Sequence, residues 1–338
     1  MEKIKSFQQL EDIATAGWQS EVLYLSVEKR VFDLIKTPIP LEELAAALGY
    51  DFPILRRFFR ALEELGLVIV DGGMARNTEA AAKYLLRDAP DYQGHSILWR
   101  KKLGAAWRDL DHAFLSGGRV VFPQDESEAA VEARFRAYSF AMDDIARCKA
   151  DEIVALCPGL KEKQRILDLG SGLGAISRGF LKAQEYATAV FCDMTEVLSL
   201  CREVLPEEIC QRIRFCSLNI LESWESLAGE TFDLVVMSNI LHAFDAADNR
   251  VLLGKVAEHL NDEGVVLIHD FYYDHAPKKA ALTDLNMLIN TYNGRVYSFR
   301  ETKALLQENG IPYTKEISLA SDTALILGAE NREALEGV

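Results

Sequence analysis

From Arg165 onward, the chain alternates short apolar runs with segments long enough to form helices. Parallel neighbouring strands need a crossover of a dozen or more residues, usually a helix. Strands buried on both faces read as unbroken apolar runs. The alternation therefore predicts an α/β domain with a parallel sheet covered on both faces. The expected strands are Ile166–Leu169, Ala189–Cys192, Ile213–Cys216, Leu234–Met237 and Val265–Ile268.

Two further strands are expected near the end of the chain, Lys315–Leu319 and Thr323–Leu327, and the turn 320–322 separates them. Three residues are too few for a helical crossover. We therefore expect the last strand to run antiparallel to its neighbours.

A glycine-rich loop joins the first of these strands to a helix expected over 175–183. Gly170, Gly172 and Gly174 stand at alternate positions, where the absence of a Cβ permits a tight turn and close approach of a ligand. The helix start adds free amide groups. Asp193 lies 19 residues after Gly174, at the end of the next strand. A carboxylate there can accept both hydroxyls of a ribose.

The loop alone does not distinguish a dinucleotide from an adenosyl cofactor, and a purely structural loop is a further alternative. Asp168, just before the first glycine, is unfavourable beside a pyrophosphate but suits a ligand with an amine and a sulfonium. With the terminal antiparallel strands, this favours S-adenosylmethionine.

The amino-terminal part shows a different pattern. Helices are expected over Leu41–Leu48 and Pro53–Leu65, followed by a hairpin of Leu67–Val70 and Met74–Thr78. Two helices joined by a tight turn and followed by a hairpin form a winged-helix unit.

A winged helix can bind DNA or contact protein. Only a few basic residues of the second helix favour DNA, namely Arg56, Arg57 and Arg60. The net charge of −15 opposes binding to a phosphate backbone. We therefore expect a protein-interaction unit and no nucleic-acid partner, and a ligand-sensing DNA-binding regulator is the alternative from another class.

The helix expected over Glu21–Leu34 carries more apolar positions than a small domain can bury, which predicts a homodimer.

The six cysteines show no metal-ligand spacing, and no metal is expected. Neither a signal core nor a run of about 18 apolar residues appears, so we expect a cytoplasmic protein without a membrane partner. The expected domains are 1–90, bridging helices over 91–157, and a cofactor domain over 158–338.

Several motifs together resemble the small-molecule O-methyltransferases of the plant caffeate and hydroxyindole type and their bacterial relatives. The resemblance covers nearly the whole chain. It rests on the winged-helix unit, Phe135–Met142, the loop DLGSGLG at 168–174, Phe232–Val236 leading into Asn239–His242, and Phe299–Leu306 before Gly310.

The resemblance implies a class I methyltransferase with a Rossmann-like sheet and an intertwined homodimer formed by the amino-terminal domain. It implies S-adenosylmethionine as the cofactor and a small, aromatic or polycyclic acceptor. Asn219 stands where an aspartate usually contacts the adenine amine. The implied cofactor residues are Asp168, Gly170, Gly172, Asp193, Met194, Asn219, Ile220 and Ser238. The implied acceptor residues are Phe135, Tyr138, Met142, Met287 and Asn290.

His242 falls on the family's general base, which takes a proton from the acceptor hydroxyl. The family's acidic neighbours are replaced here, because Ala243 follows the histidine and Val296 stands where a carboxylate is expected. Asp284 matches a family position and is expected to supply part of the orienting role. The replaced neighbours keep an alternative open, in which the cofactor serves a carbon acceptor or altered chemistry.

His269 and Asp270 end the next strand on the ligand side. We expect both to border the same cleft, with side chains that point apart because successive strand residues face opposite sides.

Overall fold

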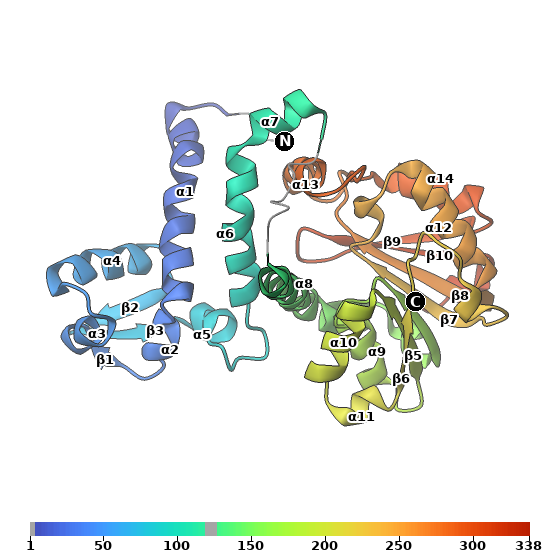
Figure 1. Cartoon of the computed structure of the whole chain (residues 1–338), viewed down its shortest axis with the longest axis horizontal. Helices are drawn as coiled ribbons and strands as arrows, with labels where there is room; N and C mark the ends of the chain where they lie inside the picture. The colour runs from blue at the N-terminus through green and yellow to red at the C-terminus, as the bar shows by residue number, and fades with distance from the viewer. Residues whose placement is uncertain (1–3, 119–126) are drawn as a thin grey trace. The chain divides into compact units, whose positions relative to one another are not determined.

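A computed structural model describes residues 4–118 and 127–338. The chain forms two compact units that divide between Gly104 and Ala105 (Figure 1). This division lies inside the bridging segment expected over 91–157, and the finer three-part division stays a prediction.

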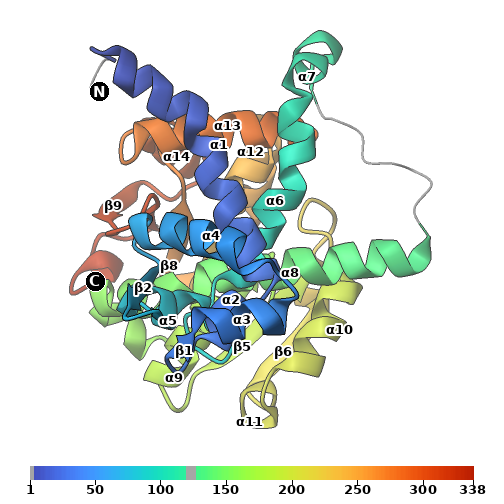
Figure 2. The same cartoon turned by 90° about the vertical axis from the view of Figure 1, so that its left-hand side faces the viewer.

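The first unit is a small helical domain with a three-stranded antiparallel sheet in the order β1-β3-β2. Helix α1 packs against α2 and α4, as Figure 2 shows from the side of this unit. The expected pair of helices and the hairpin are confirmed. The elements are α1 (Phe7–Glu28), α2 (Val31–Leu34), β1 (Ile39–Pro40), α3 (Leu41–Leu48), α4 (Phe52–Glu64), β2 (Val68–Asp71), β3 (Met74–Asn77) and α5 (Glu79–Leu85), and α6 (Gly94–Arg108) begins in this unit and crosses the division.

Local chemistry explains the hairpin and the paired helices. Gly49 ends α3 in a left-handed conformation, and the Asp51 carboxylate accepts the amide of Ile54 at the start of α4. Gly72 and Gly73 both have positive φ, as the tightest hairpin turns require.

The prediction of one helix over 21–34 is wrong. Helix α1 ends at Glu28, and Arg30 takes a left-handed conformation with φ of 56° before α2 begins. The break turns the chain so that Val31 and Phe32, each 1% exposed, enter the core of this unit. Burial of two large side chains outweighs the cost of a left-handed arginine.

The second unit contains a seven-stranded sheet in the order β6-β5-β4-β7-β8-β10-β9. Strands β4 to β8 are mutually parallel, and β10 runs antiparallel to both β8 and β9, which confirms both sheet predictions. The strands are β4 (Arg165–Leu169), β5 (Thr188–Asp193), β6 (Ile213–Ser217), β7 (Phe232–Ser238), β8 (Leu260–Asp270), β9 (Tyr313–Ser318) and β10 (Ala324–Ala329).

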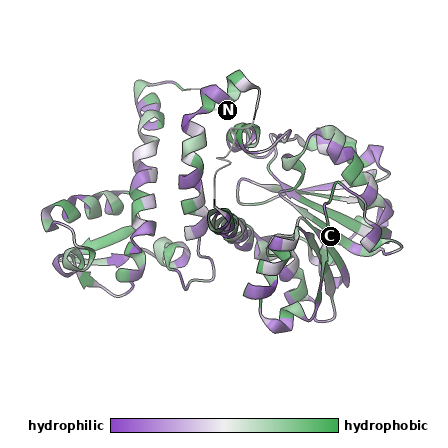
Figure 3. Cartoon of the chain, in the orientation of Figure 1, coloured by the Kyte–Doolittle hydropathy of each residue, from purple (hydrophilic) through white to green (hydrophobic). Residues whose placement is uncertain are grey.

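Helices cover both faces of this sheet, because successive strand residues alternate between two hydrophobic cores. Ile166 belongs to the core that holds α8, α9 and α10, whereas Leu167 belongs to the core that holds α12 and α14. The central strands β4, β7 and β10 are accordingly mainly hydrophobic (Figure 3), whereas the edge strand β9 is largely polar and exposed. The helices are α7 (Leu110–Ser116), α8 (Glu128–Leu156), η1 (Pro158–Glu162), α9 (Ala175–Ala183), α10 (Thr195–Val204), α11 (Glu207–Cys210), η2 (Glu225–Leu227), η3 (Leu241–Ala243), α12 (Ala246–Glu258), α13 (Pro277–Asn290), α14 (Phe299–Glu308) and η4 (Glu333–Leu335).

All six cysteines are free thiols. Within residues 4–118 and 127–338, no cluster of three or more histidine, cysteine or acidic side chains is arranged to hold a metal ion. Among the described helices, none combines the length and apolar character that crossing a bilayer requires.

Candidate active site

The glycine loop leaves β4 at the edge of the sheet where all the parallel strands end. Gly170, Gly172 and Gly174 have φ of 62°, 55° and 73°, a conformation that side-chain-bearing residues rarely adopt. A Cβ on Gly170 would stand 2.2 Å from the Ile240 side chain, whereas one on Gly172 would meet no atom within 4 Å. The loop is therefore packed tightly below and leaves open space at Gly172, as a cradle for a ligand requires.

Asp193 ends β5 beside this loop. Its carboxylate accepts the amide of Gly172 at 2.8 Å through one oxygen and the amide of Met194 at 2.8 Å through the other. Each oxygen retains capacity for a second donor. The carboxylate thus fixes the loop and can still accept two ribose hydroxyls.

Three other predicted cofactor residues lie at the ends of neighbouring strands. Met194 follows β5 with 56% of its surface exposed, as a side chain that covers a flat ring would be. Asn219 follows β6 and is exposed, with its side-chain oxygen accepting the amide of Leu221 at 3.1 Å and its nitrogen donating to Glu222 at 2.9 Å. Ile220 is half-buried beside it.

Asp168 is the last-but-one residue of β4 and is 3% exposed. Burial raises the pKa of its carboxyl group to about 7, and the charge of Asp193 adds to the rise. A buried carboxyl group of this kind is stabilised in its ionised form by a nearby cation. Asp168 therefore fits a positively charged ligand above the loop.

His242 lies on the short turn η3 that follows β7, and it is paired with Asp270. Its Nδ1 stands 2.5 Å from Oδ1 of Asp270, and its backbone amide donates to Oδ2 at 3.2 Å. The Asp270 side chain is 3% exposed and that of His242 is 12% exposed. The imidazole is thus oriented by a buried carboxylate, which leaves Nε2 as the nitrogen that can act on a ligand.

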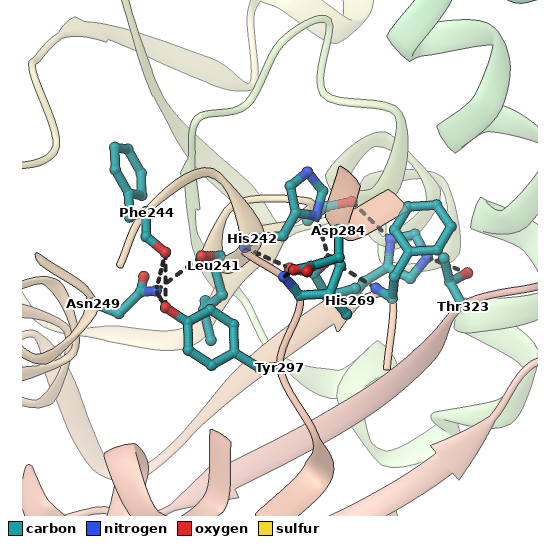
Figure 4. Close-up of polar contacts among 12 residues, drawn as sticks. Leu241, His242, Phe244, Asn249, His269, Asp284, Tyr297 and Thr323 are labelled. Atoms are coloured by element: carbon teal, nitrogen blue, oxygen red, sulfur yellow. Dashed lines mark hydrogen bonds and ion pairs between the residues drawn. The ribbon is translucent and has the colours of Figure 1, made fainter. Parts of the chain in front are cut away.

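Asp284 was expected to supply part of this orientation, and the structure gives it another contact. Its carboxylate, on α13, accepts the amide of Val296 at 2.7 Å (Figure 4). The carboxylate on His242 is Asp270, whose role the sequence did not identify. The sequence feature that could have identified Asp270 is its position at the end of a strand next to the strand that precedes His242.

The turn that carries His242 is held from two sides (Figure 4). The Asn249 side chain, fully buried on α12, donates to the carbonyl oxygens of Leu241 at 2.8 Å and Phe244 at 3.2 Å. The Tyr297 hydroxyl donates to the same Phe244 oxygen at 2.8 Å. A Cβ on Gly294 would lie 2.4 Å from the carbonyl oxygen of His242, so the opposite segment packs directly on the turn.

Ser238, the last residue of β7, lies beside the glycine loop, because Met237 pairs with Leu169 across the two strands. The Ser238 hydroxyl stands 2.8 Å from Nδ1 of His269, which is fully buried. His269 and Asp270 therefore point apart, as expected from their adjacent places on one strand.

The five predicted acceptor residues lie on two helices. Phe135, Tyr138 and Met142 are on α8, which packs along α9. Met287 and Asn290 are on α13, which contacts the His242 turn. The structure thus brings the helix that carries two of the five into contact with the turn that carries the candidate base.

Two family models match the chain. An O-methyltransferase domain model matches residues 101–312, and an O-methyltransferase dimerisation domain model matches residues 12–87.

Curated relatives and solved structures agree with these matches. The chain is 26% identical over 330 residues to a 3-hydroxy-5-methyl-1-naphthoate 3-O-methyltransferase of Streptomyces sahachiroi, with 93% of this chain and 92% of that protein covered. It is 26% identical to the tetracenomycin polyketide synthesis 8-O-methyl transferase of Streptomyces glaucescens, with 95% and 96% covered. The crystal structure of human N-acetylserotonin methyltransferase in complex with S-adenosylmethionine superposes with a TM-score of 0.83 at 21% identity, covering 98% of this chain and 100% of that one. The chain belongs to the O-methyltransferase family of S-adenosylmethionine-dependent enzymes.

Proposed function

We propose that this enzyme transfers the methyl group of S-adenosylmethionine to a hydroxyl group of a small aromatic or polycyclic acceptor, with His242 as the general base. The observation that carries the proposal is the His242–Asp270 pair, held on a turn beside the glycine loop. The naphthoate substrate and the polyketide synthesis named for the two Streptomyces relatives support the acceptor class.

The cofactor residues fit S-adenosylmethionine. Gly170 and Gly172 would approach it, Asp193 would accept its ribose hydroxyls, and Asp168 would face its positive charge. Met194, Asn219 and Ile220 would border the adenine ring. When bound, the cofactor supplies an electrophilic methyl group on a sulfonium, whose departure leaves a neutral thioether.

Methylation of a hydroxyl group requires removal of its proton, and His242 is the group proposed to remove it. Because Asp270 accepts the proton on Nδ1, the neutral imidazole presents an unprotonated Nε2. Nε2 takes the proton of the acceptor hydroxyl, and Asp270 stabilises the resulting imidazolium. Asp270 touches the base and not the acceptor, so it is a positioning residue.

The acceptor would lie against both helices that carry the predicted pocket residues. Phe135, Tyr138, Met142 and Met287 offer apolar and aromatic surface for a flat ring. The Asn290 side chain donates to the Asn286 carbonyl at 2.9 Å, while its own oxygen is buried without a hydrogen-bond partner. That oxygen can accept a hydrogen bond from a ring hydroxyl.

Product analysis tests this function directly. The enzyme is incubated with cofactor labelled in the methyl group and a panel of phenols, enols and tetrapyrroles. We expect label in methyl ethers, with the highest yield for phenols, because a more acidic hydroxyl gives up its proton more readily to His242. Label in carbon–methyl bonds, with no methyl ether formed, would replace this proposal by the carbon-acceptor alternative.

Asp193→Ala is expected to weaken binding of S-adenosylhomocysteine by about 1–3 kcal/mol, the usual cost of removing a buried polar partner. The change also frees the amide of Gly172. Titration calorimetry measures the loss, with Asp322→Ala, at an exposed ion pair with Lys279, as the control. Unchanged affinity in Asp193→Ala would remove Asp193 from the site.

A homodimer through the amino-terminal unit is the second part of the proposal, supported by the dimerisation domain match. The structure moves the expected contact surface. Val31 and Phe32 are buried in the core of the unit and cannot contact a second copy. On α1, by contrast, Phe7 is 76% exposed, Ile13 60% and Trp18 72%. Burial of such side chains between two copies is favourable.

Light scattering tests the dimer. We expect a dimer for the full-length chain and a monomer for the Ile13→Asp and Trp18→Ser double variant. A stable monomer of the unaltered chain would refute it. A cytoplasmic location and the absence of a nucleic-acid partner stay predictions.

A further inference from the structure

His269 is a buried imidazole that the proposed methyl transfer does not use. It is 0% exposed at the end of β8, and both of its nitrogens have hydroxyl partners. Nδ1 lies 2.8 Å from the Ser238 hydroxyl, and Nε2 lies 2.8 Å from the Thr323 hydroxyl (Figure 4). Burial, then the charge of Lys149, hold the pKa of His269 well below its usual range. The ring is therefore neutral and carries a single proton.

Lys149 decides which nitrogen holds that proton. Its ammonium, on α8, donates to the Thr323 hydroxyl oxygen at 3.0 Å. An ammonium has no acceptor atom, so the direction of this bond is fixed. Thr323 has one proton of its own, which can go to Nε2 of His269 or to the Ser321 hydroxyl at 3.1 Å.

The two choices differ in electrostatic energy. If Thr323 donates to Nε2, the lone pair of the imidazole faces the cation of Lys149 and the N–H faces away. If Thr323 donates to Ser321, the imidazole N–H points toward that cation. A buried site strengthens such charge–dipole differences. The first arrangement is favoured, and it places the imidazole proton on Nδ1.

Ser238 then accepts from His269, and its own proton is free to point elsewhere. Ser238 is half-buried at the end of β7, beside the first turn of the glycine loop. Asp193, the proposed ribose partner, lies on the other side of β4, at the end of β5. The part of the cofactor nearest Ser238 is therefore its amino-acid end.

We propose that Lys149, Thr323 and His269 form a directional hydrogen-bond chain that makes the Ser238 hydroxyl a dedicated donor to the carboxylate of the cofactor. That carboxylate is an acceptor only, and it is the one anionic group of S-adenosylmethionine. The ammonium and sulfonium groups cannot accept a hydrogen bond. The inference rests on the proposed placement of the cofactor over the glycine loop. His269 is here a positioning residue.

Calorimetry with two ligands tests the donor. S-adenosylhomocysteine carries the carboxylate, and its decarboxylated analogue lacks it. We expect Ser238→Ala to weaken binding of S-adenosylhomocysteine by about 10- to 100-fold, as for a lost hydrogen bond to a charged group, and to leave binding of the analogue unchanged. Equal losses for the two ligands, or no loss for either, would overturn the proposal. Ser318→Ala, at the end of β9, is the control.

Asp193→Ala separates this proposal from the cofactor site itself. It should weaken both ligands alike, because both contain the ribose. If Asp193→Ala has no effect on either, the placement of the cofactor fails. If Asp193→Ala behaves as expected while Ser238→Ala does not discriminate, only the hydrogen-bond chain fails.

Nitrogen-15 NMR of the unaltered enzyme reads the tautomer without any substitution. We expect His269 to show a protonated Nδ1 and an unprotonated Nε2. A proton on Nε2 would refute the proposed hydrogen-bond chain.

Two variants of His269 give a functional test, because asparagine places a donor near Nδ1 and glutamine places its amide near Nε2. His269→Asn should retain more of the carboxylate discrimination than His269→Gln, and the reverse order would also contradict the proposal.

Discussion

His242→Gln is expected to lower turnover by about 10²–10⁴, the range for loss of a general base, while the affinity for S-adenosylhomocysteine stays unchanged. Glutamine fills similar space but takes no proton at neutral pH. The proton of the acceptor hydroxyl then has no basic group to receive it. Steady-state kinetics with a phenol of ordinary acidity measures the loss, and calorimetry checks the cofactor site.

The dependence on acceptor acidity distinguishes a base from a side chain that shapes the pocket. If His242 takes a proton, the loss should shrink for phenols acidic enough to arrive ionised. If it only contacts the acceptor, the loss should be small and independent of acidity. His259→Gln is the matched control. His259 follows α12, its Nδ1 lies 2.8 Å from the carbonyl oxygen of Lys255, and it precedes β8, at the opposite end of that strand from Asp270.

Sequence patterns were sufficient to predict the sheet. Most of its strands are continuous apolar runs, and the length of each connection indicates whether the next strand runs parallel or antiparallel. The antiparallel β10 followed from the three-residue turn before it, and the structure confirms it. The break between α1 and α2 could not be predicted in this way. A left-handed arginine carries no local signal, and it is imposed by burial of Val31 and Phe32.

The candidate site shows the same division. The glycine loop and Asp193 are adjacent through one strand pairing, so strand order alone brings them together. Asp270 is 28 residues from His242, and two strands place them at one edge. Alternation along β8 predicted that His269 and Asp270 point apart, but it could not say which one faces the imidazole. That choice depends on the path of the turn after β7, which Asn249 and Tyr297 hold.

Asp270→Asn is the substitution expected to come closest to loss of the base itself. Both carboxylate oxygens accept backbone amides, Oδ1 from Phe271 at 2.7 Å and Oδ2 from His242 at 3.2 Å, while Oδ1 also faces Nδ1 of His242. Asparagine has a single acceptor oxygen. If the asparagine oxygen takes the place of Oδ2, the side-chain amide nitrogen faces Nδ1 of His242. The neutral imidazole must then carry its proton on Nε2, so His242 cannot accept a proton from the acceptor. If the asparagine oxygen takes the place of Oδ1, the amide nitrogen opposes the backbone amide of His242 and displaces the turn.

Either outcome lowers turnover, by about 10²–10⁴ on the pattern of other carboxylate–histidine pairs, with little change in cofactor affinity. Asp284→Asn is the matched comparison, because its carboxylate accepts the amide of Val296. Its asparagine oxygen can keep that bond, and we expect a loss of less than tenfold. Steady-state kinetics of both variants decides between the two carboxylates. If Asp284→Asn costs as much turnover as Asp270→Asn, orientation of His242 does not rest on the contact at 2.5 Å alone, and Asp284 regains the role that the sequence predicted for it.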